Sequence, residues 1–456
     1  MKNIKKALAC VAAVGTATLA AATPEVSNVT MVQASSSRLV TITYELSEDA
    51  VVTLDVLTNA TPNAVTGWVS IGGKAICNAE GAVWRKVTST DADGNGKYTI
   101  TWRPDLSWLD ESGNGFKVGN GCAKAVVTAW SLDNTPNYMV VDVSAAAKPN
   151  TQRYYPAADF LPGGVSNSLY KTTTFLMRKI MAKDVKWTMG STSTETQRTA
   201  AREGTHQVTL TNNYYIGVSE VTQTQWNQVT AGYSTISAHF TTEGFMRPME
   251  KVCYNEIRNA MDTQTVNASY DWPADPNPAS FLGRLRSKSG IDFDLPSEAQ
   301  WEFAARAGNG VGYWSDGSVI LNTAVDANLA RLGRYKNNCP GGEDSTSTLA
   351  PSAGGTAIVG SYEPNSWGLY DTMGNVWEWC LDWSENDITA YGGAVNINSA
   401  SPAKTLSGTT GLQRQHRGGC WNGAVGGSRP AFRGASAPSL RSNNIGFRVL
   451  CSAGLR

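Results

Sequence analysis

The chain has 456 residues, a length that suggests two or three domains, and its 38 basic residues equal its 38 acidic ones. No basic run occurs, so the sequence lacks the electrostatic signature of a protein that binds nucleic acid or an anionic membrane surface. Its 44 glycines and 15 tryptophans, with modest charge, indicate a loop-rich globular protein rather than a disordered one.

Residues 1–22 have the pattern of a secretory signal peptide. Three lysines precede a short apolar run that ends in small residues, and we expect cleavage just after Ala22. The run is too short to span a bilayer, and no later segment reaches the roughly 18 to 20 apolar residues that a membrane helix needs. The sequence therefore predicts an exported protein without a membrane span, which is secreted, periplasmic or displayed at the cell surface.

Residues 25–145 read as short strands separated by turn clusters. Five segments alternate apolar and polar residues: RLVTITYEL, AVVTLDVL, GKYTITWRP, KAVVTAWSL and YMVVDVS. This period of two, repeated at short intervals, predicts an all-β sandwich of the immunoglobulin-like type. The loop DADGNG at 91–96 begins like a calcium-binding loop, but Trp102 occupies the twelfth position, where a bidentate glutamate is needed. We therefore expect a tight turn there.

Residues 146–168 are rich in Ala, Pro, Gly and Ser, and we expect a linker there. Beyond it, KWTMGS and HQVTLTNNYYIGVSEVT are typical of strands, whereas TQTQWNQVTAG and PSEAQWEFAARAG are typical of helices. The second helix is expected to begin after Ser297 as its N-cap and to end just before Gly308. Long segments of Gly, Asn and Ser fill the rest, which predicts few regular elements.

The cysteine count bears on disulfides and metal sites. Export permits disulfides, and seven cysteines lie outside the first 22 residues: Cys77, Cys122, Cys253, Cys339, Cys380, Cys420 and Cys451. An odd number leaves at least one thiol free or intermolecular. Cys77 and Cys122 are the two in the N-terminal region, so we expect them to pair. No CxxC occurs, and the histidines show no zinc-site spacing: His206, His239 and His416.

The stretch GLYDTMGNVWEWCLDW, residues 368–383, contains three tryptophans, a glutamate and a cysteine just after a Gly-Asn turn. Trp377, Trp379 and Trp383 are compatible with a plain aromatic core, since large aromatic side chains dominate burial energetics. Glu378 would then lie among apolar rings, where a buried carboxylate needs a partner or a cation. Spacing alone leaves both interpretations open.

Six segments together resemble a known family. They are WTMGST, YYIGVSEVTQTQW, FDLPSEAQWEFAARAG, GSYEPNSWGLYDTMGNVWEWCLDW, HRGGCWNG and FRGASAPSLRSNNIGFRVL. In order and spacing they are similar to the formylglycine-generating enzyme domain, also called the sulfatase-modifying factor domain. The resemblance covers residues 170–453 and implies an α+β, C-type-lectin-like fold with little regular secondary structure.

The resemblance implies structural calcium. In that family the backbone carbonyls and the glutamate of the G-N-x-W-E turn bind a calcium ion, which would map here to Gly374, Val376 and Glu378. Oxygen ligands are those that calcium takes, so a cation would explain the position of Glu378. A second family site would use Asn328 and Leu329, with an acidic partner expected at Asp344.

The resemblance fails at the catalytic centre. The family's aerobic enzymes hold copper between two thiolates and use it with oxygen to convert a substrate cysteine to formylglycine. The matching positions are Gly423 and Ser428 here, and neither can replace a soft thiolate for monovalent copper, so we expect no copper. The family's pocket serine corresponds to Cys420. The sequence assigns no catalytic residue, and the pocket candidates are Trp379, Cys420, Trp421 and Ser428.

Cys420 has two interpretations. Cys253 stands where the family usually has a serine, and both segments approach the core of the domain, so a structural disulfide between Cys253 and Cys420 is one expectation. A free, functional Cys420 thiol is the other, because connectivity cannot be read from sequence. The sequence predicts no pairing for Cys339, Cys380 and Cys451.

Two functions follow from the resemblance. The first is a non-catalytic binding module whose loops face an extracellular or surface ligand or protein, with these residues around the vacated pocket: Trp421, Asn422, Ser428, Arg429 and Phe432. A similar NIGFR segment ends the variable proteins of diversity-generating retroelements, which share this fold. The alternative is an oxidoreductase of the formylglycine-generating or nonhaem-iron family that acts on a sulfatase or another substrate. Iron-dependent relatives use three histidines, whereas those of this chain are scattered, so we expect the binding module.

Overall fold

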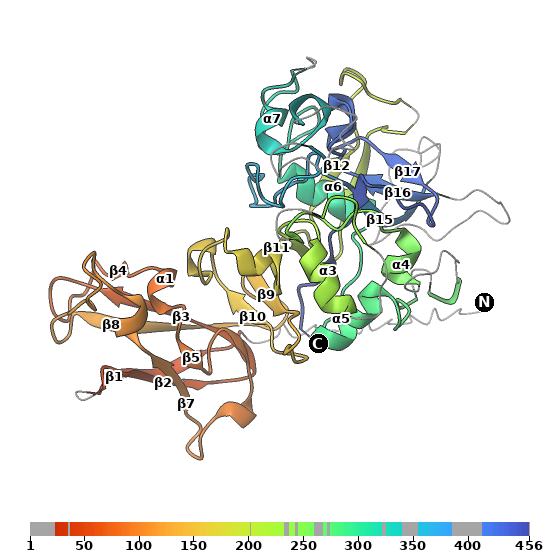
Figure 1. The fold of residues 1–456 in the computed structure, drawn as a ribbon. Coiled ribbons are helices and arrows are strands. Elements are labelled where there is room, and N and C mark those ends of the chain that lie inside the picture. The colour runs from red at the N-terminus through yellow and green to blue at the C-terminus, as the bar shows by residue number, and fades with distance from the viewer. Residues whose placement is uncertain are drawn as a thin grey trace, which may run out of the picture.

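The computed structural model describes residues 23–34, 37–200, 202–231, 237–241, 245–259, 268–270, 274–321, 325–339, 354–384 and 413–455. The predicted signal peptide lies outside these residues. The described chain is mostly β with few helices (Figure 1). None of its described helices has the length and apolar character needed to cross a membrane.

The N-terminal region consists of two antiparallel sheets. One has the order β1-β2-β7-β5 and contains β1 (Val26–Gln33), β2 (Val40–Leu46), β7 (Tyr98–Trp102) and β5 (Glu80–Gly81). In the other sheet, β3 (Ala50–Thr58) pairs with three strands: β4 (Val69–Ser70), β6 (Arg85–Val87) and β8 (Ala123–Trp130). Two short helices lie in the connections, α1 (Gly73–Ile76) and α2 (Pro104–Ser107).

The two sheets share one hydrophobic core. Ile42 and Ile100 from the first sheet and Leu54 from the second are fully buried in it. The predicted alternation is confirmed along β2, where buried and partly exposed positions alternate. Asp93 forms the turn of the DADGNG loop, because its carboxylate accepts the backbone N–H groups of residues 95 and 97, each at 2.9 Å. Assignment to the immunoglobulin-like class stays a prediction.

The last predicted strand of the sandwich belongs to another sheet. β9 (Tyr138–Asp142) pairs with β11 (Thr174–Ile180), and β10 (Arg153–Tyr155) pairs with β9. They form a five-stranded sheet, β10-β9-β11-β14-β19, with β14 (Tyr214–Gly217) and β19 (Leu450–Ser452). The predicted boundary at residue 145 therefore differs from the structure. An alternating pattern identifies a strand but not the partner with which it pairs.

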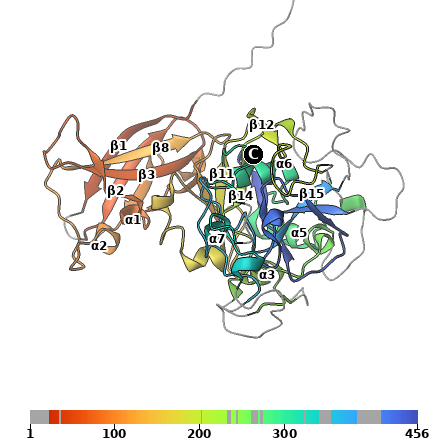
Figure 2. The ribbon, with the colours of Figure 1, turned by 90° about the horizontal axis from the view of Figure 1, so that it is seen from above.

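The segment 146–168 is packed rather than a free linker. The backbone N–H of Tyr154 donates to the carbonyl of Trp84 at 2.7 Å. Tyr155 and Leu161 are buried in the N-terminal core, whereas Tyr154 belongs to the core of the C-terminal region. Figures 1 and 2 show the two regions side by side with this segment and β9 at their junction. Its Pro and Gly residues mark turns, while its aromatic side chains fix it in place.

The C-terminal region adds short elements to the five-stranded sheet. β12 (Lys186–Met189) pairs with β13 (His206–Thr209), and a four-stranded sheet has the order β17 (Gly434–Ser436), β16 (Arg414–Arg417), β15 (Trp377–Trp383), β18 (Ile445–Gly446). Its α-helices are α3 (Gln223–Thr230), α4 (Tyr254–Arg258), α5 (Phe281–Ser289), α6 (Glu298–Arg306) and α7 (Leu329–Leu332). Short 3₁₀ turns of the whole chain include η1 (Ser89–Asp91), η2 (Ala158–Phe160), η3 (Ser168–Lys171), η5 (Ala268–Tyr270), η6 (Lys336–Asn338) and η8 (Val425–Ser428).

Both predicted helices are confirmed as α3 and α6, and each begins with a capping box. In α6 the Ser297 hydroxyl accepts the N–H of Gln300 at 3.2 Å, and the Gln300 side chain accepts the N–H of Ser297 at 2.9 Å. The left-handed residue at its end is Ala307, and Gly308 follows with a positive φ as well. α6 packs against β15 and β16 and so supports the predicted site.

Candidate functional site

The turn that precedes β15 has an unusual backbone. Asp371, Gly374 and Asn375 have positive φ angles of 55°, 92° and 61°. A Cβ at position 374 would lie 2.2 Å from the carbonyl oxygen of Arg334, so only glycine fits there. Asn375 tolerates the left-handed conformation, and its amide group donates to a Glu220 oxygen at 2.6 Å. Sequence and close packing together fix the point at which β15 begins.

Glu378 has an arginine as its partner. Its two carboxylate oxygens accept Nε and Nη2 of Arg448 at 2.5 and 2.6 Å, and the indole N–H of Trp301 donates to it at 2.7 Å. Glu378 and Arg448 are both fully buried. Burial alone lowers the pKa of Arg448, but the Glu378 carboxylate outweighs it, so the pKa is raised. A buried ion pair thus explains why a carboxylate lies among tryptophans.

Two other buried carboxyl groups lie near this pair. Burial raises the pKa of Asp371 to about 6. Burial, followed by the charges of Asp371 and Glu378, raises the pKa of Glu220 well above its usual value. The charge of this cluster is therefore reduced by protonation and partly balanced by Arg448.

The predicted calcium ligands at this turn do not fit a calcium site. Gly374, Val376 and Glu378 are adjacent in the structure, but both oxygens of Glu378 are bound by Arg448. A guanidinium in contact with the carboxylate repels a second cation placed on the same oxygens. The glutamate that the family resemblance assigned to calcium is an ion-pair partner here.

Asn328 and Leu329, the second pair of predicted calcium ligands, lie at the start of α7, where Asp326 caps their backbone N–H groups. The backbone N–H groups of Asn328 and Leu329 donate to one oxygen of Asp326, at 2.9 and 3.1 Å. The carbonyl of Leu329 accepts the N–H of Gly333 at 3.1 Å inside α7. The expected partner Asp344 lies outside the described residues. These bonds use N–H groups and not the oxygen atoms that calcium would take, so the second calcium site stays a prediction.

Cys420 is enclosed in a network of neutral amide groups. The residue is 2% exposed. Its thiol donates to Oδ1 of Asn422 at 3.1 Å, and Nδ2 of Asn444 approaches the sulfur at 3.6 Å. Burial raises the pKa of Cys420 to about 12. The metal-free thiol is therefore protonated at neutral pH and is a poor nucleophile, and a soft metal would have to displace its proton in order to bind.

Gly423 and Ser428, the positions at which the family has its copper ligands, are closely packed by neighbouring groups. A Cβ at Gly423 would lie 3.2 Å from the sulfur of Cys420, so glycine leaves room for that larger atom. Ser428, in η8, is fully buried, and its hydroxyl has no hydrogen-bond partner among the described residues. A Cβ at Gly419 would lie 2.5 Å from that hydroxyl, so the two segments are in close contact.

The two pocket tryptophans belong to the core. Trp379 is fully buried, donates from Nε1 to the carbonyl of Val252 at 3.1 Å and packs in the main C-terminal cluster. Trp421 is 2% exposed, and its ring meets Phe240 edge-on at 5.3 Å. The plain-core interpretation therefore holds for Trp379, and Trp421 is not displayed to solvent.

Arg429 forms ion pairs with a neighbouring segment and does not face solvent. It is fully buried, and its guanidinium binds both oxygens of Glu203, at 2.8 and 2.9 Å, and one oxygen of Glu195, at 2.8 Å. Of the five residues predicted around the pocket, Asn422 and Phe432 alone are partly exposed. The predicted display surface is thus much smaller than the sequence suggested.

Trp377 links the Cys420 network to the surface. Trp377 acts electrostatically on Cys420, because it lowers the pKa of that thiol slightly against the larger effect of burial. Its half-buried ring packs against Phe432, with ring centres 5.7 Å apart. The other side of the site is closed by His416, whose ring lies 4.8 Å from Trp377. Trp377, Phe432 and Asn422 form a partly exposed group, which we name the Trp377 patch.

The predicted disulfides differ from the structure, because all seven cysteines of the described residues are free. The Cys77 thiol donates to the carbonyl of Lys74 at 3.2 Å, at the end of α1. Cys122 instead faces the carbonyl of Ala60, at 3.9 Å. Cys253 begins α4 as its N-cap, and the Cys420 sulfur is bound by amide groups. A cysteine count gives neither the distance between Cα atoms nor the direction of Cβ that a disulfide needs.

The three histidines do not form a metal centre. Throughout the described ranges, no group of three or more His, Cys, Asp or Glu side chains is placed to hold a metal ion. Burial lowers the pKa of His416 to about 4, so its imidazole is neutral. His206 binds the carbonyl of Gly204 at 3.0 Å, and His239 packs edge-on against Phe240.

Sequence reasoning missed a buried ion network beneath the site. Glu302 in α6 accepts Nε of Arg306 at 2.8 Å and is also bound by Arg417 of β16. Glu298, one turn earlier, binds Arg433 through both oxygens, at 2.9 and 2.6 Å. The charged residues at 298, 302 and 306, each four positions apart, lie on one helix face. That spacing could have indicated the network.

Comparisons with known proteins agree with the motifs. The model of the Sulfatase-modifying factor enzyme 1-like domain matches residues 176–453. A formylglycine-generating enzyme of Streptomyces coelicolor is 36% identical over 167 residues, which cover 35% of this chain and 47% of that protein. Serine/threonine-protein kinase pkn1 of Chlamydia pneumoniae is 30% identical over 223 residues, which cover 46% of this chain and 31% of that protein.

Among solved structures, Treponema denticola variable protein 1 is similar at 25% identity and a TM-score of 0.45, with 61% of this chain and 96% of that chain covered. The matched segment spans less than half the length of each curated relative named above. The family model, in contrast, matches more than half of this chain. The chain therefore belongs to the family of the sulfatase-modifying factor enzyme 1-like domain.

Proposed function

We propose that this protein is a non-catalytic member of its family that binds a ligand or a protein partner. The observation that carries the proposal is the state of Cys420, which is buried, held by amide groups and given a pKa of about 12 by burial. Copper chemistry in this family needs thiolates, and Gly423 and Ser428 supply none. Nothing in this arrangement activates the remaining thiol.

Binding is proposed at the Trp377 patch. Aromatic side chains with one face exposed are frequent anchors of interfaces, because they bury a large area with little loss of conformational freedom. The Trp377 ring packs against His416 and Phe432, with ring centres 4.8 and 5.7 Å away, so its position is fixed before a ligand arrives. Asn422 adds an amide group at the edge of the two rings, and Phe432 completes the apolar face.

An oxygen-dependent assay tests the catalytic half of the proposal. The purified protein, loaded with copper, is incubated with a sulfatase peptide that carries the cysteine motif, and mass spectrometry follows conversion of the cysteine to formylglycine. An active formylglycine-generating enzyme serves as the positive control. We expect no conversion by this chain. Conversion that is lost in Cys420→Ser would support the oxidoreductase alternative.

An array of glycans and proteins tests whether the protein binds a ligand or a partner through the Trp377 patch. Phe432→Ala should abolish signals that the unaltered protein gives, because it removes half of the aromatic face. Leu440→Ala provides a matched control, since Leu440 is an apolar residue of the same segment that is 42% exposed. Equal loss in both variants would show that the Trp377 patch is not the binding site.

We also propose export, on the basis of the sequence of residues 1–22. Cell fractionation and N-terminal sequencing of the mature protein test it. The mature chain should begin at Thr23, outside the cytoplasm. A protein that keeps Met1 or its apolar run would contradict a cleaved signal peptide.

A further inference from the structure

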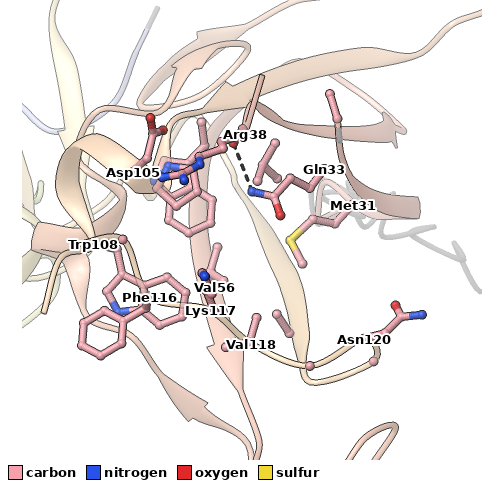
Figure 3. Close-up of a pocket in the computed structure, with 18 residues that line it drawn as sticks. Met31, Gln33, Arg38, Val56, Asp105, Trp108, Phe116, Lys117, Val118 and Asn120 are labelled. Atoms are coloured by element: carbon pink, nitrogen blue, oxygen red, sulfur yellow. Dashed lines mark hydrogen bonds between the residues drawn. The ribbon is translucent and has the colours of Figure 1, made fainter. Parts of the chain in front are cut away.

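A cavity of about 550 Å3 lies in the N-terminal sandwich, far along the chain from Cys420 and independent of the function proposed above (Figure 3). Its size falls within the range of about 300–1000 Å3 that is typical of small-ligand pockets. Met31 and Val40 line it from the first sheet, and Val56 lines it from the second. Residues 104–121, which follow β7, close its end. The cavity therefore opens between the two sheets at one end of the sandwich.

A row of three aromatic rings forms one side of the cavity. The ring centres of Trp102 and Trp108 are 6.2 Å apart with 26° between the planes, and those of Trp108 and Phe116 are 5.1 Å apart with 30°. Trp102 is 3% exposed, whereas Phe116 is 50% exposed. The row thus runs from the core to solvent and presents a nearly continuous apolar face. Such a face suits the flat apolar side of a ring-shaped ligand.

The charge at the cavity is positive. Arg38 and Lys117 line it, and the charge of Arg38 acts on the carboxylate of Asp105. The carboxylate of Asp105 also lines it, but both of its oxygens are bound by Arg103, at 2.8 and 2.7 Å. Figure 3 shows Arg38 beside Asp105, across the cavity from Asn120. Two lining cations, beside one carboxylate that Arg103 already neutralises, favour an anionic ligand.

Amide groups complete the lining. Gln33 donates from Nε2 to the carbonyl of Arg38 at 3.2 Å, which leaves its oxygen available as an acceptor. Asn120 is exposed and lines the opposite end of the cavity. Groups that both donate and accept match a ligand with several hydroxyl groups, which a simple aromatic acid lacks.

We propose that this cavity binds an acidic sugar residue, a pyranose ring that carries a carboxylate. The apolar face of the ring lies on Trp108 and Phe116, and its carboxylate lies near Arg38 and Lys117. The amide groups of Gln33 and Asn120 hydrogen-bond to its hydroxyl groups. Because the cations are exposed, the affinity falls as the salt concentration rises.

Calorimetric titration of the full mature chain tests the proposal with three probes: trigalacturonate, the neutral trisaccharide galactotriose, and benzoate. We expect trigalacturonate to bind most tightly. Phe116→Ala and Lys117→Gln should each weaken that binding about tenfold, the equivalent of one lost aromatic or charged contact. Leu106→Ala and Lys148→Gln are matched controls, because both residues are exposed and outside the cavity lining, and they should leave the affinity unchanged.

Several results would overturn the proposal. Equal binding of galactotriose would refute the role of charge, and equal binding of benzoate would refute the sugar. Absence of binding by trigalacturonate at millimolar concentration would refute the site. Equal weakening by the control variants would place the ligand elsewhere. Phe116 is half exposed, so Phe116→Ala should fold, which its melting temperature verifies, and Lys117→Gln provides an independent readout.

Discussion

Replacing Arg448 with methionine is expected to destabilise the C-terminal region by about 3–5 kcal/mol, the cost of removing one partner of a buried ion pair. Arg448 and Glu378 are fully buried, and the guanidinium binds both carboxylate oxygens. In the variant, Glu378 would keep the indole N–H of Trp301 but lose its counter-charge. Arg448 also donates to the carbonyls of Gly217 and Tyr370 at 3.0 Å each, so those acceptors would lose a donor.

This loss is large compared with the whole stability of a domain, about 5–15 kcal/mol. For a domain of this size each kcal/mol lowers the melting temperature by about 2–4 °C, so Arg448→Met should lower it by about 6–20 °C. Circular dichroism during heating, together with urea unfolding, measures both quantities. The native far-ultraviolet spectrum at low temperature verifies that the variant folds.

Arg331→Met provides the matched control. Arg331 binds Asp316 and Glu363 at the surface, where its side chain is 45% exposed. Exposed pairs contribute about 0–1 kcal/mol, so the melting temperature of this variant should be close to that of the parent protein. In a double-mutant cycle, Arg448→Met and Glu378→Gln should couple by more than about 1 kcal/mol. An Arg448→Met variant as stable as Arg331→Met, or a cycle without coupling, would refute the ion-pair account.

Three further outcomes are expected. Under native conditions the buried thiols of Cys253 and Cys420 should resist alkylation, and after denaturation every thiol should label with no cross-linked peptide; a linked Cys253–Cys420 peptide would restore the predicted disulfide. Burial, and then the Glu298 carboxylate, raises the pKa of Asp382 to about 7, so the stability due to its neutral form is complete near pH 4 and is lost as pH rises through 7. Asp382→Asn should therefore flatten the dependence of melting temperature on pH between 5 and 8, and identical slopes would disprove this. Calcium chelation should leave the melting temperature unchanged, and a fall reversed by added calcium would support the predicted site instead.

Local patterns predicted the elements well. Ser297 and Gln300 lie three residues apart, so the capping box that begins α6 is visible in the sequence. The alternation in residues 40–46 similarly predicts β2. Pairing across long distances is different, because it depends on where other segments lie. β9 has the same pattern as its neighbours in sequence, yet it pairs with β11 of the other region.

The same limit applies to the candidate site. The sequence indicates that Glu378 needs a partner, but two partners satisfy a buried carboxylate, a cation or an arginine, and Arg448 lies 70 positions away. Burial of Trp421 and Arg429 also depends on distant segments, the Phe240 loop and Glu203. Residue types were sufficient to identify the family, whereas side-chain exposure required the fold.

The sequence carries a signal of the N-terminal cavity in three aromatic residues. Trp102, Trp108 and Phe116 are spaced six and eight residues apart around the Pro104 turn, too irregularly for one helix or strand face. Aromatic residues in a loop after a strand are candidates for a binding surface. Their stacking into one row became evident with the structure.

The most direct test of the central claim is a titration of the purified protein with monovalent copper in competition with a chromophoric chelator. The claim is that the Cys420 thiol is closed and protonated and has no second thiolate beside it. We predict no tight stoichiometric binding at pH 7, and the same result for Cys420→Ser. One equivalent of tightly bound copper that is lost in Cys420→Ser would contradict the claim.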